Sequence, residues 1–75
     1  MPHIEIKCFP GRTEEQKLEC ANEIAQVVSK TLGCKVSSVS VSIKEVKEEN
    51  WKDEVWDKQI ISDKSSLYKE PGYKL

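Results

Sequence analysis

Apolar and polar residues alternate along the first segment of the chain. From His3 to Phe9, nearly every second side chain is apolar, and this period of two is typical of a half-buried strand. Pro10 and Gly11 interrupt the pattern. We therefore predict a strand over residues 3–9. Its apolar face carries Ile4, Ile6 and Cys8.

The spacing of apolar residues then changes to three or four positions, which predicts an amphipathic helix. Thr13 is followed three places later by Gln16, a capping box that marks a helix start. Gly33 stands where a left-handed residue commonly ends a helix. We expect about five helical turns between these signals. The apolar side of this helix carries Leu18, Ala21, Ile24, Ala25, Val28 and Leu32.

Alternation returns after Gly33 and predicts a second strand. Its apolar residues are Val39, Val41 and Ile43. The polar residues between and around them are Ser38, Ser40, Ser42 and Lys44. A strand, a helix and a strand in this order form a right-handed unit with parallel strands, in which the helix covers one face of the sheet.

A polar run follows the second strand and leads into another segment with helical spacing. Asn50 is a suitable N-cap, and Asp53 would favour the positive end of the helix. Pro71 and Gly72 would stop the helix. Its expected apolar side carries Trp56, Ile60, Ile61 and Leu67. We predict an extra C-terminal helix and a single domain over residues 1–75.

Two parallel strands leave two open sheet edges, and a chain of 75 residues buries only a thin core. We therefore expect a homodimer, with a higher oligomer as the open alternative. Edge-to-edge pairing of two copies would form a four-stranded sheet with two helices on one face. The fold class is then α/β, in its α+β form, with a β-α-β subunit.

The charge balance argues against several classes of partner. The chain carries 12 basic and 13 acidic residues, so it lacks the basic excess of a nucleic-acid-binding domain. No apolar run approaches the roughly 20 residues of a membrane span, and no leader precedes the first strand. We expect a cytoplasmic protein that binds neither nucleic acid nor membrane.

The three cysteines, Cys8, Cys20 and Cys34, have no metal-binding spacing, and the chain has a single histidine. Reduced thiols in a small core are the preferred interpretation, with one disulfide and a leftover thiol as the alternative. We expect no metal ion and no other cofactor.

Pro2 has the most distinctive chemistry of any residue in the chain. A small second residue favours removal of Met1, which would leave a secondary amine at the N-terminus. An α-amino group titrates near 7.7–8, and burial or a neighbouring cation lowers this pKa. Such an amine could act as a general base. The alternative is an ordinary second residue with no catalytic role.

Several features occur together along the whole chain. They are Pro2 at the start of a strand, the helix start Gly11-Arg12-Thr13-Glu14-Glu15-Gln16-Lys17, the strand Ser37-Ser38-Val39-Ser40-Val41, and the aromatic residue Trp51. In this combination the chain resembles the tautomerase superfamily, specifically the 4-oxalocrotonate tautomerase family. The opening Pro-His-Ile-x-Ile-Lys-Cys-Phe-Pro and the ending Lys-x-Pro-Gly-Tyr are similar to a dimeric subgroup that acts on phenylpyruvate-like enols.

The resemblance implies an isomerase that interconverts the keto and enol forms of a small 2-oxo acid. Pro2 matches the proline whose nitrogen moves the proton, and Arg12 matches an arginine that binds or polarises the acid. Trp51 matches an aromatic residue that lines the pocket. Ser40 takes the place of a second arginine found in hexameric members, so the substrate-binding set is Arg12, Ser40 and Trp51, and a dicarboxylate substrate is less expected.

Pro2, Arg12 and Trp51 also suit enolisation on physical grounds. Moving a proton next to a carbonyl needs a base, a cation or donor for the enolate oxygen, and exclusion of water. Two alternatives remain open. One is a non-catalytic oligomeric binding module of the same fold. The other is a hydratase or dehalogenase of short unsaturated acids, which would need a water-activating carboxylate such as Glu5 or Glu45.

Overall fold

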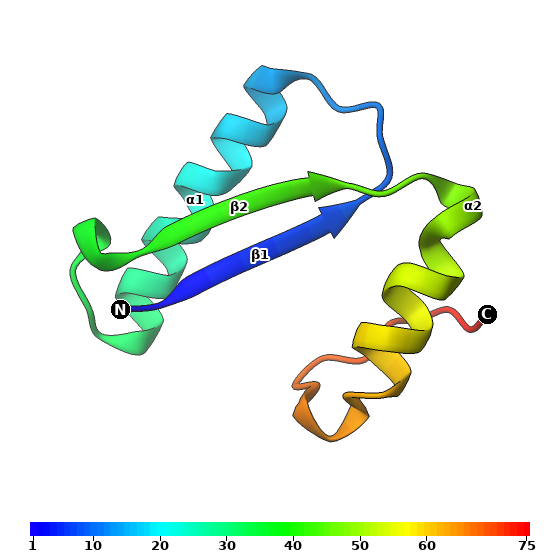
Figure 1. Cartoon of the computed structure of the whole chain (residues 1–75). Helices are drawn as coiled ribbons and strands as arrows, with labels where there is room; N and C mark the ends of the chain where they lie inside the picture. Colours follow the sequence, from blue (N-terminus) through cyan, green and yellow to red (C-terminus); the bar gives the residue numbers. More distant parts are fainter. The chain divides into compact units, whose positions relative to one another are not determined.

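Strands β1 (His3–Cys8) and β2 (Ser40–Glu45) pair in parallel in the computed structural model, which describes all residues from Met1 to Leu75. Helix α1 (Glu14–Leu32) joins the two strands and lies along one side of the sheet (Figure 1). The predicted order of strand, helix and strand is confirmed, and so is the small α+β fold. The pairing of two copies into a four-stranded sheet stays a prediction.

Short-range signals set both ends of α1. The Thr13 hydroxyl accepts a hydrogen bond from the Gln16 backbone N–H at 3.1 Å, and the Gln16 side chain accepts one from the Thr13 N–H at 2.9 Å. This is the predicted capping box. Gly33 has φ 70°, and its N–H donates to the Ser29 carbonyl at 3.1 Å. A glycine reaches this left-handed conformation without steric cost, so the helix ends here.

The two faces of the sheet differ in character. The register pairs Ile4 with Val41 and Ile6 with Ile43, so the apolar side chains share one face. The opposite face, called the polar face below, carries His3, Glu5, Lys7, Ser40, Ser42 and Lys44. The alternation seen in the sequence therefore separates a face that packs from a face that stays polar.

α1 packs less tightly than its apolar spacing predicts. None of its residues is fully buried, and Leu18 and Leu32 remain 64% and 69% exposed. The residues that face the sheet are half-buried: Ala21, Ile24, Ala25 and Val28. Leu18 and Leu32 belong to the apolar side of the helix but lie outside its half-buried stripe, because one helix on two strands covers a narrower stripe than the sequence pattern offers.

The second strand begins later than its alternation predicts. Residues 36–38 form the 3₁₀ turn η1 (Val36–Ser38), so Ser38 lies outside β2. The Ser38 hydroxyl donates to the Lys35 carbonyl at 2.8 Å. Serine side chains compete in this way with strand pairing, which explains why the turn forms instead.

The C-terminal part starts with helix α2 (Glu48–Trp51), which continues as the π-helical segment η2 (Lys52–Ile61). The prediction of Asn50 as the N-cap was wrong, because Asn50 lies inside α2 and its N–H donates to the Lys47 carbonyl at 2.9 Å. Glu48 and Glu49 occupy the first turn, where carboxylates favour the positive end of a helix, so the helix begins earlier.

The same helix also ends earlier than predicted. After Ile61 comes a turn and then the short 3₁₀ segment η3 (Lys64–Ser66), so Leu67 lies outside the helix. The Ser66 hydroxyl donates to the Asp63 carboxylate at 2.9 Å, a local bond that competes with helix continuation. Trp56 is buried as expected, at 8% exposure. The other buried residues are Val46 and Val55.

The chain divides into two compact units, Met1–Glu45 and Val46–Leu75. The three buried residues all belong to the second unit. The single domain expected over residues 1–75 stays a prediction. No helix has the length and apolar character that a membrane crossing requires.

Candidate active site

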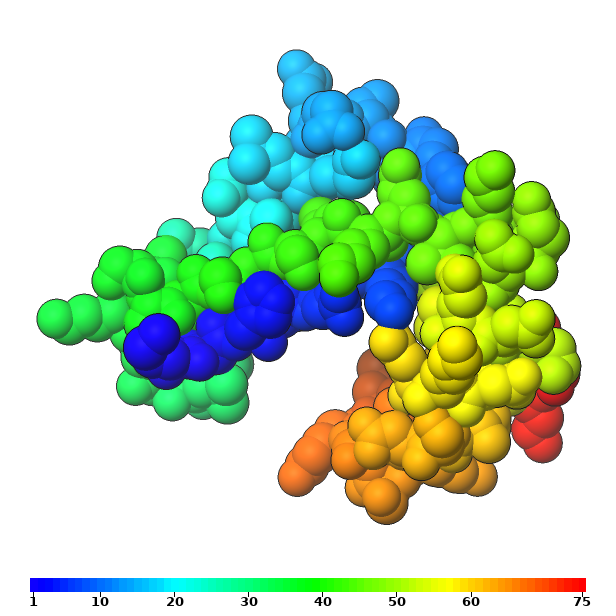
Figure 2. Space-filling model, viewed as in Figure 1, coloured from blue at the N-terminus to red at the C-terminus, as the bar shows by residue number.

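Pro2 lies at the start of β1, where the first residues of the chain reach the surface beside the start of β2 (Figure 2). Pro2 is half-buried, whereas Met1 is fully exposed. The Pro2 carbonyl accepts a hydrogen bond from the Ser40 N–H at 3.2 Å. The backbone of Pro2 is therefore held against β2, while its nitrogen is bonded to the exposed Met1.

Ser40 also contacts the residue next to Pro2. Its hydroxyl oxygen lies 2.6 Å from Nδ1 of His3, and the two residues are register partners on the polar face. The structure thus places Ser40 next to Pro2, while its assignment to the substrate-binding set stays a prediction. It also places the His3 side chain beside Ser40, although the sequence assigns no chemistry to His3.

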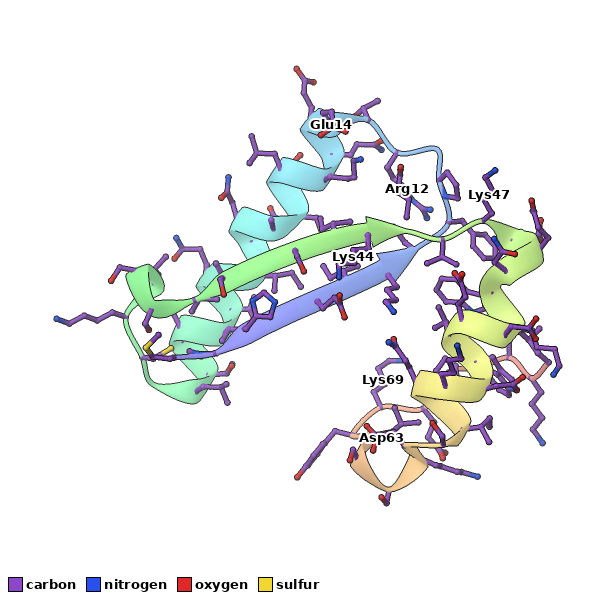
Figure 3. The ribbon with its side chains drawn as sticks, in the orientation of Figure 1. Arg12, Glu14, Lys44, Lys47, Asp63 and Lys69 are labelled. Atoms are coloured by element: carbon purple, nitrogen blue, oxygen red, sulfur yellow. The ribbon has the colours of Figure 1, made fainter.

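Arg12 lies in the loop between β1 and α1, beyond the far end of the strand that Pro2 begins (Figure 3). Its Nη1 donates to the Phe9 carbonyl at 3.2 Å, and the side chain is exposed. A strand of six residues spans on the order of 20 Å. The structure therefore does not bring Arg12 and Pro2 of one chain together.

Trp51 ends α2 in the C-terminal unit and is half-buried. Its Nε1–H donates to the Tyr73 hydroxyl at 3.1 Å. The Tyr73 ring lies 5.3 Å from the Trp56 ring, in a tilted arrangement typical of aromatic pairs. The C-terminal tail thus returns to fix the orientation of Trp51.

The two candidate water-activating carboxylates are both paired with lysines. Glu5 lies 2.7 Å from Nζ of Lys44, and this hydrogen bond and charge hold the pKa of Glu5 below its ordinary value. Glu45 lies 3.6 Å from Nζ of Lys17. The pKa of Lys17 is raised, first by its hydrogen bond with Glu14 and in part by Glu45. Because a cation lowers the pKa of Glu5, its carboxylate is a weaker base for water.

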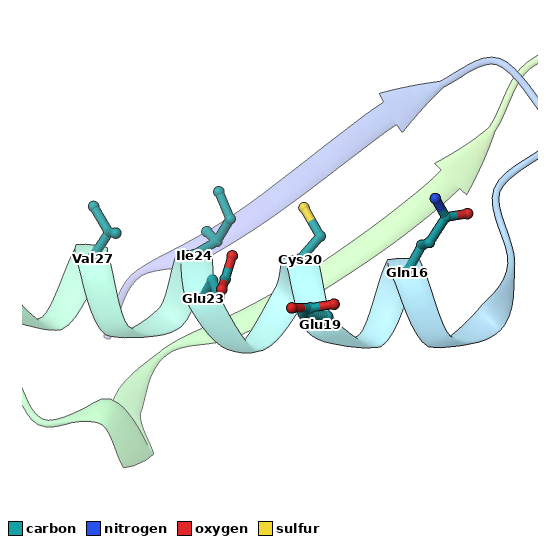
Figure 4. A pocket seen from close by; sticks show the side chains of 6 residues that line it. All are labelled: Gln16, Glu19, Cys20, Glu23, Ile24 and Val27. Atoms are coloured by element: carbon teal, nitrogen blue, oxygen red, sulfur yellow. The ribbon is translucent and has the colours of Figure 1, made fainter.

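A hollow along α1 contains none of the expected site residues (Figure 4). Its lining residues are Gln16, Glu19, Cys20, Glu23, Ile24 and Val27. The three cysteines are all free thiols. The alternative with a disulfide is therefore wrong, and exposed Cys20 does not join the small core that was expected to hold the thiols.

Comparison with known proteins gives a consistent result. A family model described as tautomerase enzyme matches residues 2–55, more than half of the chain. The chain belongs to the tautomerase family. Tautomerase PptA of Cronobacter sakazakii is 46% identical over 76 residues, and that of Enterobacter sp. is 45% identical, with complete coverage of both chains in each case.

A solved structure also resembles this tautomerase. It belongs to the 4-oxalocrotonate tautomerase isozymes of Methylibium petroleiphilum and is 36% identical, with a TM-score of 0.63. The match covers 67% of this chain and 81% of that chain. These relatives confirm that the chain is an enzyme of the isomerase class, with tautomerase activity and the fold of 4-oxalocrotonate tautomerases.

Two residues that contact the expected site residues of this tautomerase were given no role from its sequence. His3 is bonded to Ser40, and Tyr73 is bonded to Trp51. His3 alternates with apolar residues, which places it on the polar face, and it belongs to the opening motif that carries the resemblance. Tyr73 ends the C-terminal motif of the resemblance, but its position after the helix stop gave no indication that it bonds Trp51.

Proposed function

We propose that this tautomerase converts the enol form of a 2-oxo acid with an aromatic or apolar tail into its keto form, and back. The Pro2 amine, formed by removal of Met1, accepts the proton from the enol hydroxyl and returns it to the adjacent carbon. An amine with a pKa of 8 is free base in about a tenth of the molecules at pH 7, and a pKa one unit lower raises this share to about half.

The observation that carries this proposal is the position of Pro2. Its carbonyl is fixed by Ser40, its nitrogen lies at the surface end of β1, and the Met1 bonded to that nitrogen is exposed. Loss of Met1 would therefore expose an amine without disturbing the pairing of the strands. The match of residues 2–55 to the tautomerase family begins at this same proline.

Arg12 enters the proposal as a residue of a second chain. Pro2 and Arg12 lie near opposite ends of β1, so one chain cannot bring them together. Antiparallel pairing of two exposed sheet edges sets the end of one strand beside the start of the other. A homodimer of this kind would bring Arg12 of the partner subunit towards Pro2, where its guanidinium would bind the acid.

Two further roles belong to the same proposal. Trp51, oriented by Tyr73, serves as an aromatic wall that excludes water from the reacting atoms. The homodimer is supported by the first unit, which contains no fully buried residue and leaves Leu18 and Leu32 exposed. The cytoplasmic location stays a prediction. Water addition has no comparable support, because Glu5 and Glu45 are paired with lysines.

The test is a comparison of substrates with enzyme shown by intact mass to begin at Pro2. Ketonisation of phenylenolpyruvate and of a dicarboxylic dienol is followed by the loss of enol absorbance. We expect a higher kcat/KM for the monoacid, because Ser40 offers no second cation. A preference for the dicarboxylate would contradict the proposed substrate class, and the absence of turnover with both would contradict the proposed reaction.

A further inference from the structure

His3 and Ser40 form a fixed polar pair beside Pro2. The side-chain hydrogen bond measures 2.6 Å, and the Ser40 N–H bonds the Pro2 carbonyl at 3.2 Å. Ser40 therefore contacts Pro2 through its backbone and His3 through its hydroxyl. Both side chains are exposed. An exposed imidazole is thereby held in one position next to the residue that supplies the amine.

The direction of this hydrogen bond decides what the imidazole offers to a ligand. When the Ser40 hydroxyl donates to Nδ1, the neutral ring carries its proton on Nε2. The outer nitrogen of His3 is then an N–H donor. A carboxylate or an enolate oxygen is a suitable acceptor for such a donor, and a hydrogen bond to a charged acceptor is about twice as strong as a neutral one.

The charged neighbours on the polar face leave this donor available. Glu5 is the nearest carboxylate along β1, and it already pairs with Lys44 at 2.7 Å. Lys7 lies further along the same face, towards the end of β1. The start of the polar face therefore presents His3 and Ser40 next to Pro2, with the nearby carboxylate engaged elsewhere.

We infer that His3 is a substrate-binding residue whose Nε2–H binds the carboxylate of the 2-oxo acid, and that Ser40 positions it. This inference rests on the proposed function. In a 2-oxo acid the carboxylate carbon is two bonds from the carbon that receives the proton. A donor on the residue adjacent to Pro2 is therefore suitably close to bind the acid group while the Pro2 amine moves the proton. Ser40 acts through His3 rather than by contact with the substrate.

The kinetic test uses His3→Phe, which keeps a ring but has no donor, and Ser40→Ala, both in enzyme that begins at Pro2. Ser42→Ala is the control, because Ser42 lies on the same face of β2, two residues further along. For phenylenolpyruvate we expect KM to rise about tenfold or more in His3→Phe and several-fold in Ser40→Ala, with small changes in kcat. Ser42→Ala should match the wild type. The loss in His3→Phe should be about tenfold greater for the acid than for its methyl ester.

Equal losses for the acid and the ester would overturn the inference, as would an unchanged KM in His3→Phe. A binding experiment separates this result from failure of the proposed function. Because His3 is the only histidine, its imidazole nitrogen signals in an NMR spectrum need no further assignment. The probe is phenylacetate, which has an aromatic ring and a carboxylate but no 2-oxo group, so it can bind without reacting.

We expect phenylacetate to shift the Nε2 signal of His3. In the absence of ligand, Ser40→Ala should change the proportions of the two His3 tautomers. If the wild type is inactive but this shift appears and His3→Phe binds phenylacetate about tenfold more weakly, the proposed reaction fails and the carboxylate site stands. If the Nε2 signal does not respond to phenylacetate, the inference is overturned whether or not the enzyme is active.

Discussion

Tyr73 joins the C-terminal tail to both tryptophans of the chain, which makes it the most informative position for a stability test. Its hydroxyl accepts a hydrogen bond from Trp51 at 3.1 Å, and its ring pairs with Trp56 at 5.3 Å. Tyr73→Phe removes only the hydroxyl. Tyr73→Leu removes the hydroxyl and the aromatic ring. The two variants therefore separate the hydrogen bond from the ring contact.

The expected magnitudes follow from these two contacts. A neutral hydrogen bond contributes about 0.5–1.5 kcal/mol, and we expect the lower end because Tyr73 is 43% exposed. An aromatic pair contributes a further 0.5–1.5 kcal/mol or so beyond the area it buries. Tyr73→Phe should therefore lower the Tm by about 2–4 °C, and Tyr73→Leu by roughly two to three times as much.

Tryptophan fluorescence during thermal or urea unfolding measures this effect directly, because Trp51 and Trp56 are the only two tryptophans of the chain. Tyr68→Phe is the matched control, since Tyr68 is fully exposed and should leave the transition unchanged. If Tyr73→Phe unfolds like the wild type while Tyr73→Leu is destabilised, the hydrogen bond has no energetic weight. If neither variant changes the transition, the tail does not hold Trp51 at all.

Three further predictions concern the first unit. Thr13→Ala removes the helix cap and should lower the free energy of unfolding by about 0.5–2 kcal/mol, as measured by urea unfolding. Equal urea midpoints for the variant and the wild type would contradict this. Arg12→Ala should lower kcat/KM on the order of 10²-fold, about 2.7 kcal/mol, with little change in Tm, and an unchanged kcat/KM would make Arg12 a solvated loop charge. The pKa of Glu5 is lowered by Lys44, so its contribution to stability is present above the ordinary carboxyl pKa and is lost as pH falls through the lower folded value. Glu5→Gln should therefore lose less stability than the wild type between pH 6 and pH 3, and parallel curves of urea midpoint against pH would refute this.

The sequence was most informative where structure depends on near neighbours. The capping box of Thr13 and Gln16 spans three residues, and the alternation along β1 sets its own two faces, so both appeared as predicted. The start of β2 and the end of the C-terminal helix were predicted wrongly. The Ser38 and Ser66 hydroxyls form hydrogen bonds there with residues three positions earlier, and these bonds compete with the strand and the helix. The spacing of apolar residues contains no information about this competition.

The site was predictable only in part, because its contacts join distant positions. Pro2 was proposed from its chemistry alone, and its catalytic role stays a prediction. The bond between His3 and Ser40 spans 37 residues and depends on the register of the strands. The bond from Trp51 to Tyr73 spans 22 residues and depends on the return of the tail after the helix. Neither the register of the strands nor the path of the C-terminal tail can be predicted from the local spacing of apolar and polar residues.

The most direct test of the account is the dependence of activity on the N-terminus. Preparations with different degrees of Met1 removal are quantified by intact mass spectrometry, and the ketonisation rate of each is measured at equal protein concentration. The rate should be proportional to the fraction of chains that begin at Pro2 and should vanish when every chain retains Met1, while the unfolding transition stays the same. Full activity in a sample that retains Met1 throughout would contradict a Pro2 amine as the catalytic base.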